Sequence, residues 1–104
     1  MIKHIVMWKL KEFAEGASKM ENARKLKTRL EALPAMIMIK EMQAVEVGIN
    51  CIPSEAAYDV VMYSEFEDKA ALLAYQQHSE HRKLISEFLD KVRIDKKVVD
   101  YEVK

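Results

Sequence analysis

The first residues of the chain alternate between two faces, as the residues of a β-strand do. From Ile2 to Lys11, one face carries His4, Val6, Trp8 and Leu10. The other face is charged at its ends and carries Ile5 and Met7 in the middle. A sheet that is covered on one side only does not normally place two large apolar side chains on its open face. We therefore expect a second copy of the chain to cover the face with Ile5 and Met7.

A helical period follows a short loop at residues 13–17. Ser18 and Glu21 have the spacing of a capping box, in which each side chain satisfies a backbone N–H group of the other, so the helix should begin near Ser18. Pro34 disfavours a helical backbone at the residue before it and should end this helix at Leu33. The apolar stripe of the helix consists of Met20, Ala23, Leu26, Leu30 and Leu33.

Two further strands are predicted in the middle of the chain. Apolar residues favour a strand from about Lys40 to Ile49, and alternation favours another from Tyr58 to Phe66. The connection over residues 50–57 is short, so an antiparallel hairpin is the natural pairing.

The last third of the chain predicts a second helix and a final strand. Asp68 is a suitable N-cap for a helix whose apolar face begins at Ala71, and Ser79 could begin a fresh segment after a bend. Alternating residues around Val99 and Tyr101 then predict the last strand.

The resulting order is β-α-β-β-α-β, which is the ferredoxin-like α+β plan with two helices on one face of a four-stranded antiparallel sheet. The chain of 104 residues has the size of a single domain, so we take residues 1–104 as one domain. Half of the residues are hydrophobic, which suggests more apolar surface than one copy of so small a chain can bury. This composition again favours a homodimer.

Charge and hydropathy exclude several classes of partner. Lys plus Arg and Asp plus Glu both number 17, and no basic stripe stands out, which argues against nucleic acid and against an anionic membrane surface. No apolar run approaches the roughly 18–20 residues of a membrane span. The N-terminal residues also lack the apolar stretch of a signal peptide, so we expect a cytoplasmic location.

Glycine and cysteine usage limits the cofactors. The two glycines, Gly16 and Gly48, are too few for a glycine-rich phosphate loop or a dinucleotide fingerprint. The single cysteine, Cys51, cannot form an internal disulfide or a zinc cage. We therefore expect no cofactor.

The histidines are the candidates for chemistry. His4 shares its face with Val6 and Trp8, and two interpretations stay open: a buried histidine bonded to a neighbour, or a group that contacts a ligand and exchanges protons near neutral pH. His78 and His81 are three residues apart and could share a helical face, but a metal site needs a third ligand, so we expect none. His78 is expected to cap the bend instead.

Several segments together resemble the stress-responsive A/B barrel domain (Dabb) family. The resemblance covers the whole chain, and its more specific part is the opening Lys-His-hydrophobic strand combined with the Tyr-x-x-His-x-x-His segment. The segments are Lys3-His4-Ile5-Val6, Trp8-Lys9-Leu10-Lys11, Leu33-Pro34-Ala35, Val47-Gly48-Ile49-Asn50, Tyr58-Asp59-Val60-Val61, Phe66, Tyr75-Gln76-Gln77-His78-Ser79-Glu80-His81 and Asp100-Tyr101. The resemblance implies a ferredoxin-like protomer whose sheet closes against that of a partner in a dimeric α+β barrel.

The family includes a plant polyketide cyclase, and the resemblance to it implies a set of site residues. That enzyme performs an intramolecular aldol condensation in a pocket between sheet and helices, and its catalytic positions match His4, His81 and Tyr75 here. Two further pocket positions fall at Leu26 and Val60, where the cyclase has a tyrosine and a histidine. With Trp8 as a wall, these residues define the expected ligand pocket.

Three functions remain open at the level of the sequence. The favoured one is a dimer that binds a small apolar ligand without efficient catalysis, because only part of the catalytic set of the cyclase is present. The second is an enzyme that acts on a hydrophobic carbonyl compound with His4 and His81 as acid and base. The third, by fold analogy alone, is a haem-degrading or quinol-type monooxygenase.

The favoured site has a defined geometry. We expect His4 and His81 to converge at one end of a cavity between sheet and helices, with Tyr75 and Trp8 nearby. His81 should lie near the start of a helix, whose positive end favours a neutral imidazole.

Overall fold

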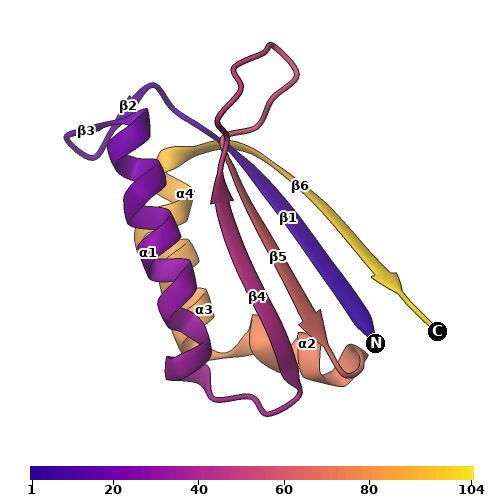
Figure 1. Ribbon diagram of the computed structural model, residues 1–104. Helices are drawn as coiled ribbons and strands as arrows, with labels where there is room; N and C mark the ends of the chain where they lie inside the picture. The colour runs from indigo at the N-terminus through magenta and orange to yellow at the C-terminus, as the bar shows by residue number, and fades with distance from the viewer.

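The computed structural model describes residues 1–104 and contains a four-stranded antiparallel sheet with helices on one of its faces (Figure 1). The strands are β1 (Ile2–Leu10), β4 (Met42–Ile49), β5 (Val60–Phe66) and β6 (Arg93–Glu102). Their order in the sheet is β4-β5-β1-β6, so β1 is an inner strand with a neighbour on each side. The expected ferredoxin-like α+β fold is therefore confirmed.

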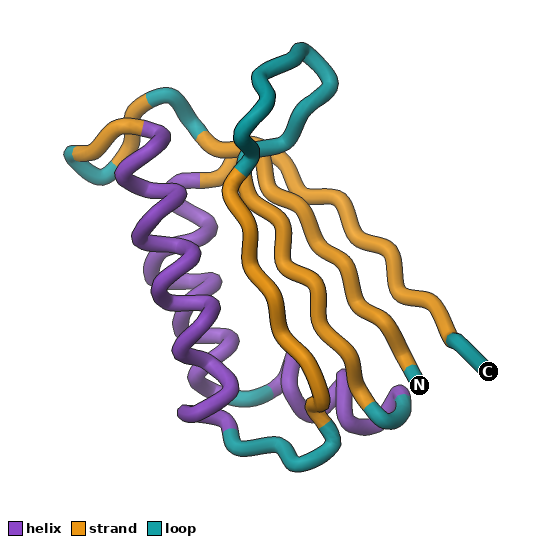
Figure 2. Tube along the Cα trace, in the orientation of Figure 1, coloured by secondary structure: helices purple, strands orange, loops and turns teal.

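The helical layer consists of one long helix and one broken helical segment. Helix α1 (Lys19–Ile37) runs beside the second segment along the sheet, and α2 lies at the end of the sheet near the N-terminus (Figure 2). The second segment contains α2 (Lys69–Gln77), α3 (Ser79–Leu84), a π-helical turn η1 (Ile85–Leu89) and α4 (Asp90–Val92). The residues expected as a loop before α1 form a small hairpin of β2 (Phe13–Ala14) and β3 (Ala17–Ser18).

The expected caps are confirmed. Ser18 and Glu21 form the capping box of α1, and the Asp68 carboxylate accepts a hydrogen bond from the Ala71 N–H at 2.9 Å. Nδ1 of His78 accepts a hydrogen bond from the Glu80 N–H at 3.1 Å, which places a cap at the bend between α2 and α3. These local bonds account for where the helices begin.

The expected end of α1 at Leu33 is wrong. The helix continues through Pro34 to Ile37, whose side chain is buried in the core. Met38 then adopts a left-handed backbone with φ of 58° and donates its N–H to the Pro34 carbonyl at 2.9 Å. Burial of Ile37 and this C-terminal cap offset the hydrogen bond that the proline ring removes.

The expected strand limits also need correction. Strand β5 begins at Val60 rather than Tyr58, and β6 begins at Arg93 rather than near Val99. Strand β6 is long because it pairs with β1 along its whole length, from Leu10 opposite Arg93 to Ile2 opposite Glu102. It is an edge strand whose residues are mostly exposed, so its polar first half shows no apolar alternation to predict it from.

The two faces of the sheet differ in burial. The helix-facing side chains form one core with the apolar stripe of α1, and Leu26 and Val60 are fully buried in it. The opposite face carries Ile5, Met7 and Val61, which no element of this chain covers completely. None of the helices combines the length and apolar character needed to cross a bilayer.

The burial of Leu26 leads to a stability prediction. Replacing Leu26 with Ala removes a fully buried side chain and leaves a cavity, so the free energy of unfolding should fall by about 2–5 kcal/mol in a urea titration. The matched control is Leu73→Ala on α2, where the side chain is exposed and the loss should be below about 0.5 kcal/mol. Equal losses in the two variants would contradict the placement of Leu26.

Candidate functional site

A cavity of about 80 Å³ lies between the sheet and the second helical segment. Its floor comes from β1, β5 and β6, and its roof comes from α1 and from the residues between Tyr75 and Asp90. Most of the lining is apolar, and a few polar side chains converge on it, which is the usual character of a small-molecule site. The lining residues are His4, Val6, Trp8, Leu30, Met62, Tyr75, Gln76, His81, Leu84, Ile85, Leu89, Asp90, Arg93, Lys96 and Val98.

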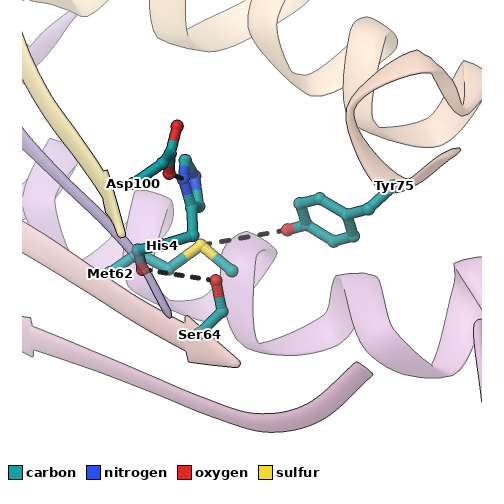
Figure 3. Close-up of polar contacts among 5 residues, drawn as sticks. All are labelled: His4, Met62, Ser64, Tyr75 and Asp100. Carbon is teal, nitrogen blue, oxygen red and sulfur yellow. Dashed lines mark hydrogen bonds and ion pairs between the residues drawn. The ribbon is translucent and has the colours of Figure 1, made fainter. Parts of the chain in front are cut away.

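His4 is held in the cavity wall by its neighbours in the sheet. The residue lies on β1 directly opposite Asp100 of β6, and its Nδ1 is paired with a carboxylate oxygen of Asp100 (Figure 3). Its carbonyl accepts a hydrogen bond from the Ser64 hydroxyl at 3.5 Å. The Asp100 carboxylate favours the tautomer with the proton on Nδ1, so Nε2 of a neutral His4 is an acceptor. That Nε2 makes no hydrogen bond within the chain.

Asp100 is a site residue that the sequence analysis missed. It lies in the alternating stretch around Val99 and Tyr101, and its place in the site depends on the strand register that puts it opposite His4. The alternation of β6 was the one available signal, because Asp100 falls between the outward-facing Val99 and Tyr101.

His81 enters the cavity from α3. Its Nδ1 is buried without a hydrogen-bond partner, and its ring meets the Tyr75 ring edge to face with 4.9 Å between centroids. Burial lowers the pKa of His81, and the charges of His4 and Lys96 lower it further, while the nearby polar backbone of Gln76 acts in the opposite direction. The sequence predicted a neutral His81 because of the nearby helix end. In the structure, burial is the main reason why the neutral form is favoured.

Tyr75 lies on α2 and is fully buried. Its hydroxyl points toward the sheet and contacts Sδ of Met62 at 3.8 Å (Figure 3). Burial raises the pKa of Tyr75, so the phenol stays protonated near neutral pH. The hydroxyl can therefore act as a donor, and in this structure its partner is a thioether and not a histidine.

The structure brings four of the sequence-derived site residues to one cavity and leaves two outside it. His4, His81, Tyr75 and Trp8 all line the cavity, whereas Leu26 and Val60 lie in the core and do not. Nε1 of Trp8 is buried without a hydrogen-bond partner. The indole therefore adds a second unsatisfied polar atom to the residues around the cavity, beside Nδ1 of His81.

Charged residues of α4 and β6 also contribute to the lining. Arg93 and Lys96 belong to the part of β6 that the sequence analysis did not identify as a strand. Nε of Arg93 contacts a carboxylate oxygen of Asp90 at 3.2 Å. Because Lys96 is exposed while the neighbouring His4 and Trp8 are buried, these charges mark the side on which the cavity meets solvent.

The residues present do not suggest a metal centre. No group of three or more His, Cys, Asp or Glu side chains is arranged to hold a metal ion. His4 directs one nitrogen to Asp100, and Cys51 is exposed in the loop between β4 and β5. The geometry is instead suited to hydrogen bonding and proton exchange with an organic ligand.

Comparisons with known proteins agree with this architecture. The family model described as "Stress Responsive A/B Barrel Domain" matches residues 2–103. A dimeric protein of unknown function with a ferredoxin-like fold from Bacteroides fragilis NCTC 9343 is 31% identical, with 98% of this chain and 95% of that chain covered and a TM-score of 0.79. No curated protein matches the sequence at a significant level.

Two more distant structures share the fold. A Dabb family protein from Mesorhizobium loti is 20% identical, with a TM-score of 0.71 and with 99% and 96% of the two chains covered. A hydroxynitrile lyase from Passiflora edulis is 18% identical, with a TM-score of 0.76 and with 99% and 93% covered. At these identities the likeness concerns the fold alone.

The lowered pKa of His81 predicts a pH dependence of stability. The unfolded chain binds a proton at this residue at a higher pH than the folded chain does, so stability should fall as the pH drops below about 6.5, the ordinary pKa of histidine. His81→Asn removes this contribution, so its urea midpoint should change less between pH 7.5 and 5.5 than that of the parent protein. If the urea midpoints of the two proteins change equally with pH, the lowered pKa of His81 is contradicted. An NMR titration of the His81 imidazole gives the direction of the pKa shift independently.

Proposed function

The chain belongs to the stress-responsive A/B barrel domain family, and we propose that it binds a small apolar ligand with a carbonyl group in the cavity between sheet and helices. The observation that carries this proposal is the presence of His4 and His81 in the lining of one apolar cavity, each with a ring nitrogen that has no partner in the chain. Unpaired polar groups in an apolar wall are the features that orient a ligand.

The two histidines offer complementary contacts. Nε2 of His4 is an acceptor as long as Asp100 keeps the proton on Nδ1. A neutral His81 carries one N–H, which can donate to a carbonyl oxygen. The aliphatic walls from Val6, Leu84 and Ile85 would enclose the hydrocarbon part of the ligand.

A second candidate function is catalysis of enolisation next to the carbonyl, and the His4–Asp100 pair favours it. Nε2 of His4 would take a proton from the carbon beside the carbonyl and become an imidazolium, and the N–H of the neutral His81 would donate a hydrogen bond to the enolate oxygen that forms. Asp100 would stabilise the imidazolium that forms on His4, as the carboxylate does in other His–Asp pairs. The monooxygenase alternative rests on fold likeness alone, to an antibiotic biosynthesis monooxygenase that is 17% identical with a TM-score of 0.69.

Binding can be followed through the single tryptophan of the chain. We expect 2-heptanone to shift the indole N–H signal of Trp8 in ¹⁵N spectra, and His4→Ala and His81→Ala each to weaken this binding about fivefold, as the loss of one hydrogen bond would. The matched control is His78→Ala, because the third histidine caps α3 and does not line the cavity. Equal effects of all three substitutions, or no shift in the parent protein, would contradict the proposal.

The same samples separate binding from catalysis. In D₂O, an enolising protein should speed the incorporation of deuterium at the carbons beside the ketone, and Asp100→Asn should slow that incorporation more than it weakens binding. If the ketone binds but its deuterium exchange is not accelerated, the ligand-binding function stands and catalysis of enolisation is rejected.

We also propose that two copies of the chain pair through the outer face of the sheet. Ile5, Met7, Val61 and Tyr63 lie together there, because antiparallel register places Ile5 opposite Tyr63 and Met7 opposite Val61. On the edge strand, Val99 is 58% exposed and extends the same surface. The 31% identical relative is described as dimeric, which supports this pairing.

The proposed interface predicts the mass in solution. Light scattering at micromolar concentration should give twice the 12.1 kDa mass of the chain. Val61→Glu should shift the protein to a monomer, because it places a charge without a partner in an apolar interface. Leu73→Glu, at an exposed leucine of α2, is the matched control and should remain dimeric. A monomeric parent protein would overturn the proposal.

A further inference from the structure

We propose that the ligand is an organic acid whose carboxylate lies at the mouth of the cavity against the ammonium group of Lys96. This inference rests on the proposed binding function and specifies the chemical class of its ligand. It depends on three features of the structure: the position of Lys96, the size of the cavity and the hydrogen-bonding character of its mouth.

Lys96 stands on the cavity side of the edge strand. Its partner in the register of β6 with β1 is Trp8, whose side chain faces the helices, so Lys96 projects to the same side and lines the same cavity. Its ammonium group takes part in none of the ion pairs of the chain. By contrast, the next residue, Lys97, projects to the opposite face and has Asp95 at 3.8 Å.

The size of the cavity indicates that a ligand must extend to this lysine. About 80 Å³ is roughly half the volume of an engineered apolar protein cavity of about 150 Å³ that binds benzene. The space therefore encloses only part of a ligand of about six carbon atoms, and the far end of such a ligand would extend to the side where Arg93 and Lys96 line the cavity. The apolar end would then lie against Leu84 and Ile85.

The mouth offers mostly hydrogen-bond donors. Lys96 and Arg93 carry only donors, and the one carboxylate among the lining residues, Asp90, is already paired with Nε of Arg93 at 3.2 Å. A carboxylate is an acceptor only, so it complements these groups. An alcohol could satisfy them in part, and an ammonium group would be repelled.

The neighbouring histidine provides an independent readout. The ammonium charge of Lys96 contributes to the lowered pKa of His81. An anion bound beside Lys96 would offset that charge, so the pKa of His81 should rise when an acid binds. A neutral ligand of the same length should not raise it, because burial alone lowers it further.

The experiment compares three probes of equal chain length: hexanoate, 1-hexanol and hexylamine. Each is titrated at pH 7.5 and low salt into the protein while the Trp8 indole signal is followed. We expect hexanoate to bind about fivefold more tightly than 1-hexanol, and hexylamine to bind most weakly. Lys96→Met should abolish the preference for hexanoate and leave the affinity for 1-hexanol unchanged.

The matched control is Lys91→Met, because Lys91 is exposed on α4 and does not line the cavity. This variant should keep the preference of the parent protein. Lys96→Gln replaces Lys96→Met if the spectrum of the latter shows loss of folding. If the preference for hexanoate survives in the Lys96→Met variant and is lost in the Lys91→Met variant, the assignment of Lys96 is overturned.

The outcomes separate this inference from the function on which it rests. Equal affinities for hexanoate and 1-hexanol in the parent protein would overturn the acidic ligand and leave the apolar binding site intact. If none of the three probes shifts the Trp8 signal, both the site and the acid preference are rejected.

Discussion

Strand β1 exchanges backbone hydrogen bonds with β5 on one side and with β6 on the other, and the side chains along it alternate between the two faces of the sheet. This pairing fixes His4, Val6 and Trp8 on the helix-facing side and Ile5 and Met7 on the outer side. A slip of one residue in either register would exchange the two sets and bury lysines in the core. The cavity, the core and the outer apolar face therefore all depend on one inner strand.

The candidate site combines polar side chains with apolar walls, and these surroundings influence where each histidine carries its proton. His4 is buried but has the Asp100 carboxylate beside it, whereas His81 has an unpartnered nitrogen and a pKa lowered mainly by burial. Two chemically identical side chains thus differ in their preferred proton positions because of their surroundings. Such a difference is what an acid–base pair requires, and it would also serve to orient a carbonyl ligand.

Much of this structure could be predicted from the sequence, because the decisive signals were local. The capping box at Ser18, the cap at Asp68 and the alternation around Val6 and Trp8 each depend on residues close together in the chain. The resemblance to the Dabb family added the positions of Tyr75 and His81. The fold and the elements that carry these residues followed from such patterns.

The remaining features depend on contacts between distant residues. Asp100 gains its role from a neighbour 96 positions away, and the first half of β6 is a strand only because β1 offers it backbone partners. Pro34 stays helical because Ile37 is buried and Met38 supplies a cap, which no local rule for proline includes. Leu26 and Val60 were expected in the pocket from the cyclase alone, and packing places them in the core instead.

The π-helical turn η1 forms part of the roof of the cavity and lies shortly before the edge strand β6 in the chain. In this turn the Asp90 N–H bonds to the Ile85 carbonyl, five residues back, so the segment holds one residue more than an α-helix of the same length. Ile85 and Leu89 line the cavity from this turn, and β6 begins only four residues after it. Deletion of Ser86 would remove the extra residue, restore a regular helix and change which side chains this turn presents to the cavity. Among homologous chains, a gap at this position should therefore coincide with a reshaped pocket, so chain length over this short stretch offers a simple marker of pocket shape.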